Sequence, residues 1–583
     1  MKRPTRLALA TFVVITLVTL PAAAVTRQVC SSGCAYATIQ AAVNAANAGD
    51  TIMVLDALHT EGGIVVGTDL TIKGDQLNPP VIQAATAPGI AVDRVLEIQP
   101  NADVVLQDLV IRHGRPTAGG GGGILNAGDL RLIRTEVVSN DANGGHGGGI
   151  FSTGPLRLED SLVSGNAADA LGGGVSCEGL CTINMLRSTL DGNVVRTTAG
   201  NEGGGGLHNL GSALLEDSLV TGNVAVGSNL DEGGGIYSPG GSLVLVDTQV
   251  TGNQASSGGG VSSGGLLTIV RGAVSDNSAT SINGGGGGLM VDGLSAILES
   301  TTITGNSSNG SCAGVLTRSP NLTIRRTAIA DNVASARAGG IGVWSGLTIL
   351  EDSLIADNTA ESGGGISVQP EASLRTRNST VSGNTAETQG GGFRVSFLGI
   401  LSLSNVTVTG NTADPNGLTD TAGGGLYVQV IPDYQGIVDV RNSIIAGNFD
   451  PGPPPYFTAP DCAGPITVDG WLSLGTDGVI LQDPACWISG ATPDIGGNQG
   501  LLPLADNGGP TLTHALDIGS PNIDTGDPSG CKNEAGAWLT HDQRGGSRFN
   551  VCDRGAYEGQ AALPVFADDF ETGETWLWTV AAD

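Results

Sequence analysis

The sequence predicts an all-β fold, a parallel β-helix solenoid with three short strands per coil, and two observations predict it. The first is a repeat. The stretch GGGIFSTGPLRLEDSLVSGN at Gly147–Asn166 returns as GGGIYSPGGSLVLVDTQVTGN at Gly233–Asn253 and as GGGISVQPEASLRTRNSTVSGN at Gly363–Asn384. Most of the spacings between the asparagines that close successive copies are 24 to 30 residues, a period typical of solenoids.

The second observation is an aliphatic residue three positions before each closing asparagine. The closing asparagines are Asn140, Asn166, Asn193, Asn223, Asn253, Asn277, Asn306, Asn332, Asn358, Asn384, Asn411 and Asn448. The aliphatic residues are Val137, Val163, Leu190, Val220, Val250, Val274, Ile303, Ile329, Ile355, Val381, Val408 and Ile445. Because every copy has one, we expect them to form a single stack that fills the inside of the solenoid.

Residues 1–24 have the pattern of a secretory signal peptide. Lys2, Arg3 and Arg6 precede the apolar run Leu7–Leu20, and small residues follow up to Ala24, after which we expect cleavage. The alternative is an N-terminal membrane anchor, but a run of about fourteen apolar residues is short for crossing a bilayer. No later segment is long and apolar enough to span a membrane.

Residues 25–118 are predicted to form an N-terminal cap and the first coils. Tyr36–Gly49 places apolar residues at helical spacing and precedes the strand-like stretch DTIMVL. A short amphipathic helix here would cover the open end of the strand stack, where backbone groups are otherwise unpaired. Residues 81–113 continue with alternating apolar and polar residues.

Residues 119–450 are predicted to be the repeat β-helix. In each copy the first strand follows the glycines, a Gly/Pro turn leads to the second, and Ser or Thr marks the bend into the third. Parallel strands joined in this way are expected to wind right-handed. Asn tolerates the left-handed backbone region that a bend before the next coil needs. Stacked Asn side chains can also bond from coil to coil, so we expect a structural ladder formed by Asn166, Asn193, Asn223, Asn253, Asn306, Asn358 and Asn384.

Six residues before the closing asparagines, opposite charges stand in neighbouring copies. They are Arg134, Asp160, Arg187 and Asp217, then Asp247 and Arg271, then Arg326 and Asp352. In register they would be about 4.8 Å apart. We interpret them as an ion-pair ladder that fixes register rather than as a catalytic set, because exposed ion pairs contribute little stability.

Length variation falls mainly between each asparagine and the next glycines. The segment is short at 254–257 and long at 194–202, 224–232 and 412–422. These loops must therefore lie on one side of the solenoid, beside the glycine-led strands, where a binding groove would form.

The period breaks at 450–460 (DPGPPPYFTAP), and residues 451–560 are predicted to be a separate β-rich region. Its charged residues Asp542, Arg544, Arg548, Asp553 and Glu558 would bind a metal or ligand or, as we favour, form buried ion pairs that cap the solenoid end. Residues 561–583, which include PVFADDFETGETWLW, form a C-terminal tail, either a sorting signal or an unstructured end.

The nine cysteines favour disulfides in an exported chain. The candidate pairs are Cys30 with Cys34, Cys177 with Cys181, Cys462 with Cys486, and Cys531 with Cys552. Cys312 is left over at a glycine position of its repeat, and we expect a buried free thiol. Zinc is the alternative for the two C-x3-C pairs, but neither has a second pair or a histidine nearby.

Three parts of the chain resemble known families. Tyr36–Gly49 with the following strand resembles the N-terminal start of pectate-lyase-like right-handed β-helix proteins, a resemblance that implies the same fold. The GGGI and Gly-Asn repeats resemble the polymorphic outer membrane protein family, which implies an adhesin-like protein at the bacterial cell surface or secreted from it. LADNGGPTLTHALDIGSPNIDTGD and HDQRGGSRFNVCDRGAYEG resemble the choice-of-anchor Q region of bacterial β-helix surface proteins.

The strongly negative net charge argues against nucleic acid and anionic lipid as partners. The net charge is −30, and near −33 without residues 1–24, which carry three basic residues and no acidic one. Such a surface repels nucleic acid and anionic lipid. It suits an exported protein. We expect no resident cofactor, although an acidic surface leaves room for Ca²⁺.

The outward residues of the glycine-led strands are the candidate site. They are Leu125, Phe151, Ser176, His208, Tyr237, Ser262, Met290, Leu316, Gly342, Ser367, Arg394 and Tyr427. None is a carboxylate, so this set lacks the acid and base that polysaccharide cleavage needs, although loop residues such as Glu202, Asp231 and Glu232 could supply them. The binding candidates are Phe151, His208, Tyr237, Arg394 and Tyr427.

These observations favour an exported, non-catalytic protein for adhesion or contact with a polysaccharide or cell-surface glycan. The alternatives are a carbohydrate-active enzyme, above all a polysaccharide lyase, and a structural spacer. No catalytic residues are assigned from the sequence.

Overall fold

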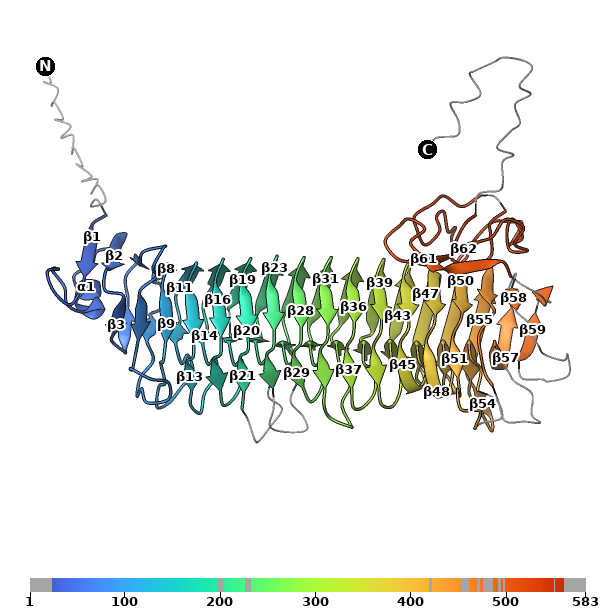
Figure 1. Cartoon of the computed structure of the whole chain (residues 1–583), viewed down its shortest axis with the longest axis horizontal. Helices are drawn as coiled ribbons and strands as arrows, with labels where there is room; N and C mark the ends of the chain where they lie inside the picture. Colours follow the sequence, from blue (N-terminus) through green and yellow to red (C-terminus); the bar gives the residue numbers. More distant parts are fainter. Residues whose placement is uncertain are drawn as a thin grey trace, which may run out of the picture.

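The structure is a computed structural model that describes residues 24–179, 181–196, 203–225, 232–418, 422–451, 461–468, 472–474, 486–490, 494–495, 499–549 and 551–559. It is an all-β parallel solenoid of about 15 turns with almost no helix, which confirms the predicted right-handed parallel β-helix. The coils stack along the long axis of the molecule (Figure 1). The expected signal peptide and the C-terminal tail lie outside the described residues, apart from Ala24.

One helix covers the N-terminal end of the stack. α1 (Ile39–Asn44) begins at Thr38, whose side chain accepts a hydrogen bond from the backbone N–H of Ala41. Its apolar side, with Ile39 and Val43, is buried against β1 (Thr26–Val29) and its neighbours. The predicted cap is confirmed, although α1 is shorter than the Tyr36–Gly49 pattern.

The glycine-led face is the sheet formed by the strands that follow the glycines and by two earlier strands in line with them. Its strands are β4 (Ile64–Val66), β7 (Leu96–Ile98), β10 (Ile124–Asn126), β14 (Ile150–Ser152), β18 (Val175–Cys177), β22 (Leu207–Asn209), β26 (Ile236–Ser238), β30 (Val261–Ser263), β34 (Leu289–Val291), β38 (Val315–Thr317), β42 (Ile341–Val343), β46 (Ile366–Val368), β49 (Phe393–Val395) and β52 (Leu426–Val428). Each strand up to β49 pairs in parallel with the corresponding strand of the next coil, for example β10 with β14 and β49 with β52.

The second face holds the second strands. After β2 (Asp50–Val54) they are β5 (Leu70–Lys73), β8 (Asp103–Gln107), β11 (Asp129–Ile133), β15 (Leu156–Glu159), β19 (Thr182–Leu186), β23 (Ser212–Glu216), β27 (Ser242–Val246), β31 (Leu266–Val270), β35 (Ser295–Glu299), β39 (Asn321–Arg325), β43 (Leu347–Glu351), β47 (Ser373–Ser382), β50 (Ile400–Thr409), β55 (Ile437–Arg441), β57 (Cys462–Val468) and β59 (Cys486–Gly490).

The third face holds the strands that end before each closing asparagine. They are β3 (Leu58–Thr60), β6 (Val81–Gln83), β9 (Val110–Arg112), β12 (Glu136–Val138), β16 (Leu162–Ser164), β20 (Thr189–Asp191), β24 (Leu219–Thr221), β28 (Gln249–Thr251), β32 (Ala273–Ser275), β36 (Thr302–Thr304), β40 (Ala328–Ala330), β44 (Leu354–Ala356), β56 (Ser443–Ile445), β58 (Leu472–Leu474) and β60 (Asp494–Ile495), with β47 and β50 running through both faces. The predicted aliphatic stack lies here: Val163, Leu190 and Val220 are register partners and almost fully buried.

A short fourth ladder follows the asparagines, which the prediction of three strands per coil did not include. It consists of β13 (Asp141–Ala142), β17 (Ala167–Ala168), β21 (Val194–Val195), β25 (Val224–Ala225), β29 (Gln254–Ala255), β33 (Ser278–Ala279), β37 (Ser307–Ser308), β41 (Val333–Ala334), β45 (Thr359–Ser362), β48 (Thr385–Gln389) and β51 (Thr412–Ala413). Its second residue is small and buried, as at Ala168 and Ala279. Strands of two residues carry too little periodicity to be recognised from sequence.

Two hairpin-like pairs lie outside this pattern. β53 (Val430–Ile431) pairs antiparallel with β54 (Tyr434–Gln435), and β61 (Leu501–Ala505) with β62 (Thr513–Leu516). Within the described residues, no helix is long and apolar enough to cross a membrane.

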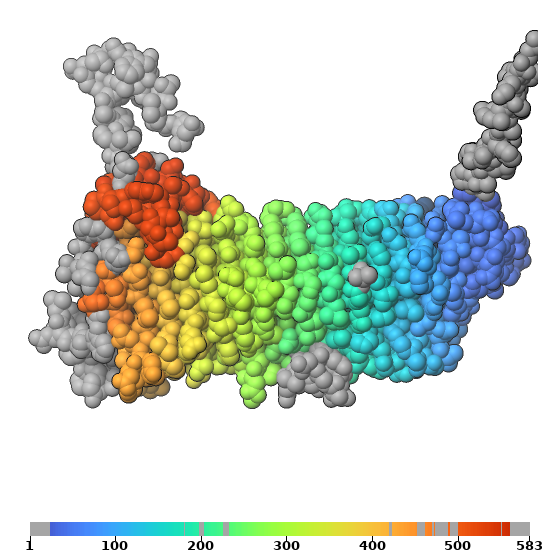
Figure 2. Space-filling model, turned by 180° about the vertical axis from the view of Figure 1, so that it is seen from behind, coloured from blue at the N-terminus to red at the C-terminus, as the bar shows by residue number. Residues whose placement is uncertain are grey.

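The C-terminal region does not cap the end of the solenoid, as its charged residues had suggested. Residues 499–559 fold back along the side of the last coils, over the second and third faces (Figures 1 and 2). Arg377 on β47 donates to Glu534, and Thr380 donates to Gln543 at 2.6 Å. The C-terminal region buries outward residues of the third face in these coils, among them Thr380 and Thr407, and Thr407 accepts a hydrogen bond from the backbone N–H of Ala556.

Candidate functional site

The outward residues of the glycine-led face form one continuous file. Each of the twelve predicted positions is the register partner of the next, from Leu125–Phe151 through to Arg394–Tyr427. The file also continues before the predicted start, because Glu97 pairs with Leu125. Glu97 was missed because β7 has no glycine lead.

Many side chains of the file are buried, so the file is not the open groove of exposed side chains that the sequence suggests. Ser176, Ser262 and Ser367 are buried, and His208 is 1% exposed. The segments that precede the glycines pair with one another alongside the file, as Gly203 does with Glu232 and Glu232 with Ser257. These segments form a wall that shields short outward side chains, so only the larger ones, such as Phe151 and Tyr237, are partly exposed.

His208 and Tyr237 form the centre of the site. Their ring centroids are 5.8 Å apart, and the planes are tilted by 32°. The Nδ1 atom of His208 lies 3.0 Å from the hydroxyl of Ser176 on the preceding coil. Burial lowers the pKa of His208 to about 4, and burial together with the nearby Glu232 raises the pKa of Tyr237 to about 12. Both rings are therefore uncharged at neutral pH.

Phe151 begins this aromatic part of the file. Its ring lies 6.1 Å from that of His146, which contacts Glu178 at 3.3 Å. Glu178 in turn lies 3.4 Å from the hydroxyl of Ser176. The polar contacts thus run from the rim at His146 to the buried Ser176–His208 pair.

Carboxylates approach the file from the wall, as the loop alternative allowed. Glu232 accepts a hydrogen bond from Ser262 at 2.7 Å, and burial raises the pKa of Glu232. Arg318 pairs with Asp292 at 3.1 Å and acts electrostatically on Glu232. Glu202 and Asp231 lie outside the described residues.

The next part of the file is apolar. Met290 and Leu316 pack with Cys312, Ala338 and Trp344 in a small cluster outside the main core. Cys312 is a buried free thiol, as predicted, and burial raises its pKa to about 12. It occupies the first glycine position with φ of 59°, and its sulfur lies where a side chain at Gly342 would be.

Arg394 and Tyr427 form the C-terminal part of the file. Arg394 is 9% exposed and donates to Ser396 at 2.7 Å and to Gln429 at 3.3 Å. The five predicted binding residues therefore lie in two groups, with Phe151, His208 and Tyr237 in one and Arg394 and Tyr427 in the other.

The asparagines form a buried ladder. Each side-chain Nδ2 donates to the Oδ1 atom of the asparagine one coil later at 2.9–3.0 Å, and the last, Asn448, donates to Asp461. The left-handed backbone lies one residue earlier than expected, for example at Gly165 and Gly192 rather than at the asparagine itself. A second ladder at the preceding bend was not predicted: the backbone N–H groups of Thr135, Ser161 and Ser188 each donate to the hydroxyl of the next coil.

The charged column six residues before the asparagines pairs only in part. Arg187 pairs with Asp160 and Arg271 with Asp247. Arg134 pairs with Asp108 one coil earlier, Arg326 pairs with Glu299 instead of Asp352, and Asp352 lies 3.2 Å from His541. What all twelve positions share is a positive φ, between 42° and 56°.

Three of the four expected disulfides are described: Cys30–Cys34, Cys177–Cys181 and Cys531–Cys552. Cys462 is also disulfide-bonded, and the side chain of its expected partner Cys486 lies outside the described residues.

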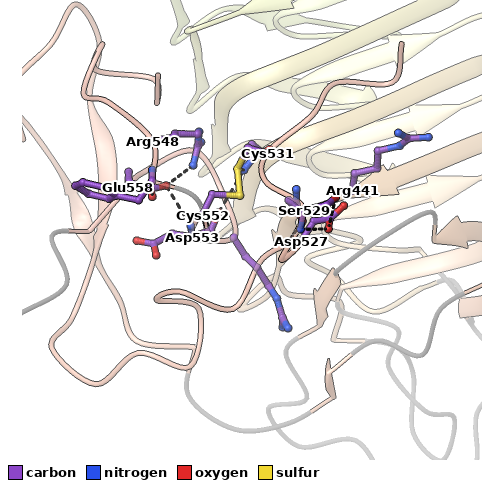
Figure 3. Close-up of a disulfide and its surroundings, with 12 residues drawn as sticks. Arg441, Asp527, Ser529, Cys531, Arg548, Cys552, Asp553 and Glu558 are labelled. Carbon is purple, nitrogen blue, oxygen red and sulfur yellow. Dashed lines mark hydrogen bonds and ion pairs between the residues drawn. A yellow bond between two sulfur atoms is a disulfide. The ribbon is translucent and has the colours of Figure 1, made fainter. Parts of the chain in front are cut away.

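The charged C-terminal cluster lies beside the Cys531–Cys552 disulfide (Figure 3). Arg548 and Glu558 form an almost fully buried ion pair of 2.7 Å, and burial raises the pKa of Asp553 to about 6. Arg544 pairs with Asp542. Four of the five residues therefore form ion pairs, as favoured, while Asp553 accepts hydrogen bonds from the backbone N–H groups of Asp524 and Gly559. No group of three or more potential metal ligands occurs anywhere in the described residues.

No protein-family model and no curated protein matches the chain. Among solved structures, a similar chain is a mannuronic acid specific polysaccharide family 6 lyase enzyme from human gut microbiota. The two are 11% identical, with a TM-score of 0.26, over 65% of this chain and 86% of that chain. A likeness of this size gives no grounds for assigning an activity or substrate.

Proposed function

We propose that this chain is an exported bacterial β-helix protein that contacts an extended polysaccharide through its glycine-led face without cleaving it. The observation that supports this most is the alignment of Phe151, His208 and Tyr237 in one file. Coils in a parallel β-helix repeat at about 4.8 Å, so the partly exposed rings of Phe151 and Tyr237 lie three coils apart along the axis, with the buried His208 next to Tyr237. Flat, rigid side chains with polar neighbours are well suited to contact sugars.

Export is proposed on separate grounds. The described disulfides are compatible with an oxidising, extracellular environment. The pattern of residues 1–24 and the resemblances to polymorphic outer membrane proteins and to the choice-of-anchor Q region favour the same location. Bound Ca²⁺ remains compatible with the net charge of −30 but has no assigned site.

Binding of immobilised polysaccharides tests the proposal. In affinity electrophoresis through gels that contain a panel of plant and algal polysaccharides, we expect at least one polymer to retard the wild-type protein. Phe151→Ala and Tyr237→Ala should reduce the retardation because they remove the ring surface. Trp538→Ala is the matched control, since Trp538 is 62% exposed and belongs to the C-terminal region rather than to the file. Saturable binding that survives both file substitutions contradicts the proposal, and no binding to any polymer favours a structural spacer.

A polysaccharide lyase is the second candidate, and one observation favours it. Glu232, whose pKa burial raises, acts electrostatically on Tyr237, and the Tyr237 ring lies 5.8 Å from that of the neutral His208, so three potential proton-transfer groups lie together. A lyase would generate an unsaturated product from uronic-acid polymers, which absorbs in the ultraviolet. Tyr237→Phe should then abolish product formation while polymer binding persists. A wild-type protein that binds such polymers without any absorbance change excludes this candidate.

A further inference from the structure

Arg394 differs from two other largely buried arginines of the chain, Arg548 and Arg377, each of which has a described carboxylate partner. Arg548 pairs with Glu558, and Arg377 pairs with Glu534. Arg394 is 9% exposed, yet among the described residues no carboxylate pairs with it. Its contacts are the neutral Ser396 hydroxyl and the Gln429 side-chain oxygen.

A guanidinium group remains charged at any pH a protein tolerates. Burying such a charge without a counter-ion costs free energy that neutral hydrogen-bond acceptors only partly offset. The cost is increased by the exposed Arg337, whose positive charge acts on Arg394. A buried arginine without an acidic partner is unexpected in a chain with 56 acidic and 26 basic residues.

The position of Arg394 places this charge in the candidate site. Arg394 is an outward residue of β49, and its register partners are Ser367 on β46 and Tyr427 on β52. Glycines lie directly against its Cβ, since an added side-chain atom at Gly390 would lie 2.9 Å from it and one at Gly363 would lie 3.3 Å from it. The arginine therefore belongs to the same file as Phe151 and Tyr237.

We propose that Arg394, with Tyr427 and the neighbouring Arg337, binds the anionic group of an acidic sugar unit, either a carboxylate or a sulfate ester. This inference rests on the proposed function for the identity of the polymer but not for the presence of an anion site. A guanidinium donates two parallel hydrogen bonds to either group, which explains why an arginine would be retained here despite its cost.

A counter-ion from the chain itself is the competing explanation. Asp420 precedes the glycines of the next coil and lies outside the described residues. If Asp420 neutralises Arg394, Asp420→Asn lowers the thermal unfolding midpoint, and added anions do not raise the midpoint of the wild-type protein. That outcome overturns the proposal.

Titration calorimetry of the full chain with oligogalacturonate, a sulfated galactan oligosaccharide and a neutral galactan oligosaccharide tests the proposal. We expect the wild-type protein to prefer one acidic probe over the neutral one, and the preferred probe identifies carboxylate or sulfate. Arg394→Gln should weaken binding of that probe on the order of tenfold or more, because a charge-assisted contact is lost. Arg325→Gln is the control, since Arg325 is on the second face and pairs with Glu351. Equal affinity for neutral and acidic probes overturns the proposal.

A measurement without polymer separates this proposal from the proposed function. Free glucuronate and sulfate should raise the thermal unfolding midpoint of the wild-type protein but not that of Arg394→Gln. Arg394→Gln without ligand should unfold at a higher temperature than the wild type because a buried unpaired charge is gone. If no polymer binds but these shifts occur, the anion site stands and the glycan-contact function fails. If neutral polymer binds and the shifts are absent, only the anion site fails.

Discussion

Single residues stabilise this solenoid mainly where their polar groups are buried. Asn253 is 1% exposed and donates to Asn277 and to the carbonyl of Val220, while its Oδ1 atom accepts from Asn223. The Arg271–Asp247 pair is exposed and adds little. The property that all positions of the charged column share is therefore not an ion pair but a left-handed backbone conformation.

Asn253→Ala is expected to destabilise the protein far more than Arg271→Ala. The substitution leaves buried donors of Asn223 and a carbonyl without partners, which costs about 1–3 kcal/mol for each group that water does not reach. Arg271→Ala should leave stability nearly unchanged. Urea unfolding followed by circular dichroism measures both. Similar effects of the two substitutions would contradict this assignment.

His208 is expected to make the protein less stable in acid. Its pKa is about 4 in the folded protein, where the ring is buried, and 6.5 in the unfolded chain, where it is exposed. The unfolded chain therefore binds the proton more readily. The stability that neutral His208 provides is present above pH 6.5 and falls as the pH drops towards 4, by about 3 kcal/mol in total. His208→Gln should remove this part of the slope in unfolding experiments between pH 7 and 4. Tyr237→Phe is the control, because phenol titrates far above this range, and an unchanged slope in His208→Gln would contradict the assignment.

At the scale of the element, the glycine triplets fix the distance between coils. At the second glycine of a triplet an added side-chain carbon would clash with backbone atoms, and the one copy with a side chain here has only the methyl group of Ala313. At Gly234 an added carbon would lie 2.4 Å from the backbone of Gln254. This close approach joins the glycine-led face to the fourth ladder, so the triplet determines where the small residues of that ladder pack.

Gly234→Ala should therefore disrupt its coil, whereas Gly240→Ala in the same coil should be tolerated. Gly240 has no atom within 4 Å of the added carbon and no positive φ. We expect reduced soluble yield or a lower thermal midpoint for Gly234→Ala alone. A tolerated Gly234→Ala would mean that the coil can shift to accept a methyl group.

At the scale of the molecule, the net charge of −30 opposes the compact state. Repulsion among exposed carboxylates decreases as salt screens them, while most of the buried contacts that join the coils are uncharged. We expect the thermal midpoint to rise when NaCl is increased from low to near-physiological concentration. Scanning calorimetry measures it, with sucrose in place of salt as the control for general cosolvent effects. A midpoint that falls as salt is added would show that attraction within surface ion pairs stabilises the fold more than repulsion among carboxylates destabilises it.

The sequence predicts the parts of the fold that repeat. The aliphatic stack, α1 and the buried thiol of Cys312 follow from periodicity and from residue type at a fixed position. The register of the outward file also follows, because one residue after each inward aliphatic of the glycine-led strand points the other way. The burial of the outward file cannot be predicted from the sequence in this way, because the wall that covers it is formed by irregular segments such as the one at Glu232.

One feature of the sequence indicates where the C-terminal region packs against the solenoid. The charged column changes to Asn378, Asn405 and Asn442 in the last coils. Asn378 donates to the carbonyl of His541, and Asn405 to that of Asp553. An amide can occupy the left-handed region and be buried, whereas a single charge would need a partner. The change of residue type therefore marks the covered stretch.

The asparagine ladder has a direction. Every Nδ2 donates one hydrogen to the Oδ1 atom of the next coil, so the side-chain amides point the same way along the axis and each link polarises the next. Each asparagine added to the ladder accepts a hydrogen bond from the one before it and brings a new Nδ2 donor that needs an acceptor in the next coil. Asp461, whose Oδ1 receives the last of these hydrogens, ends the series with a group that only accepts when ionised. The asparagine ladder thus ends with a single change from amide to acid, whereas the strand stack itself continues through β57 to β60.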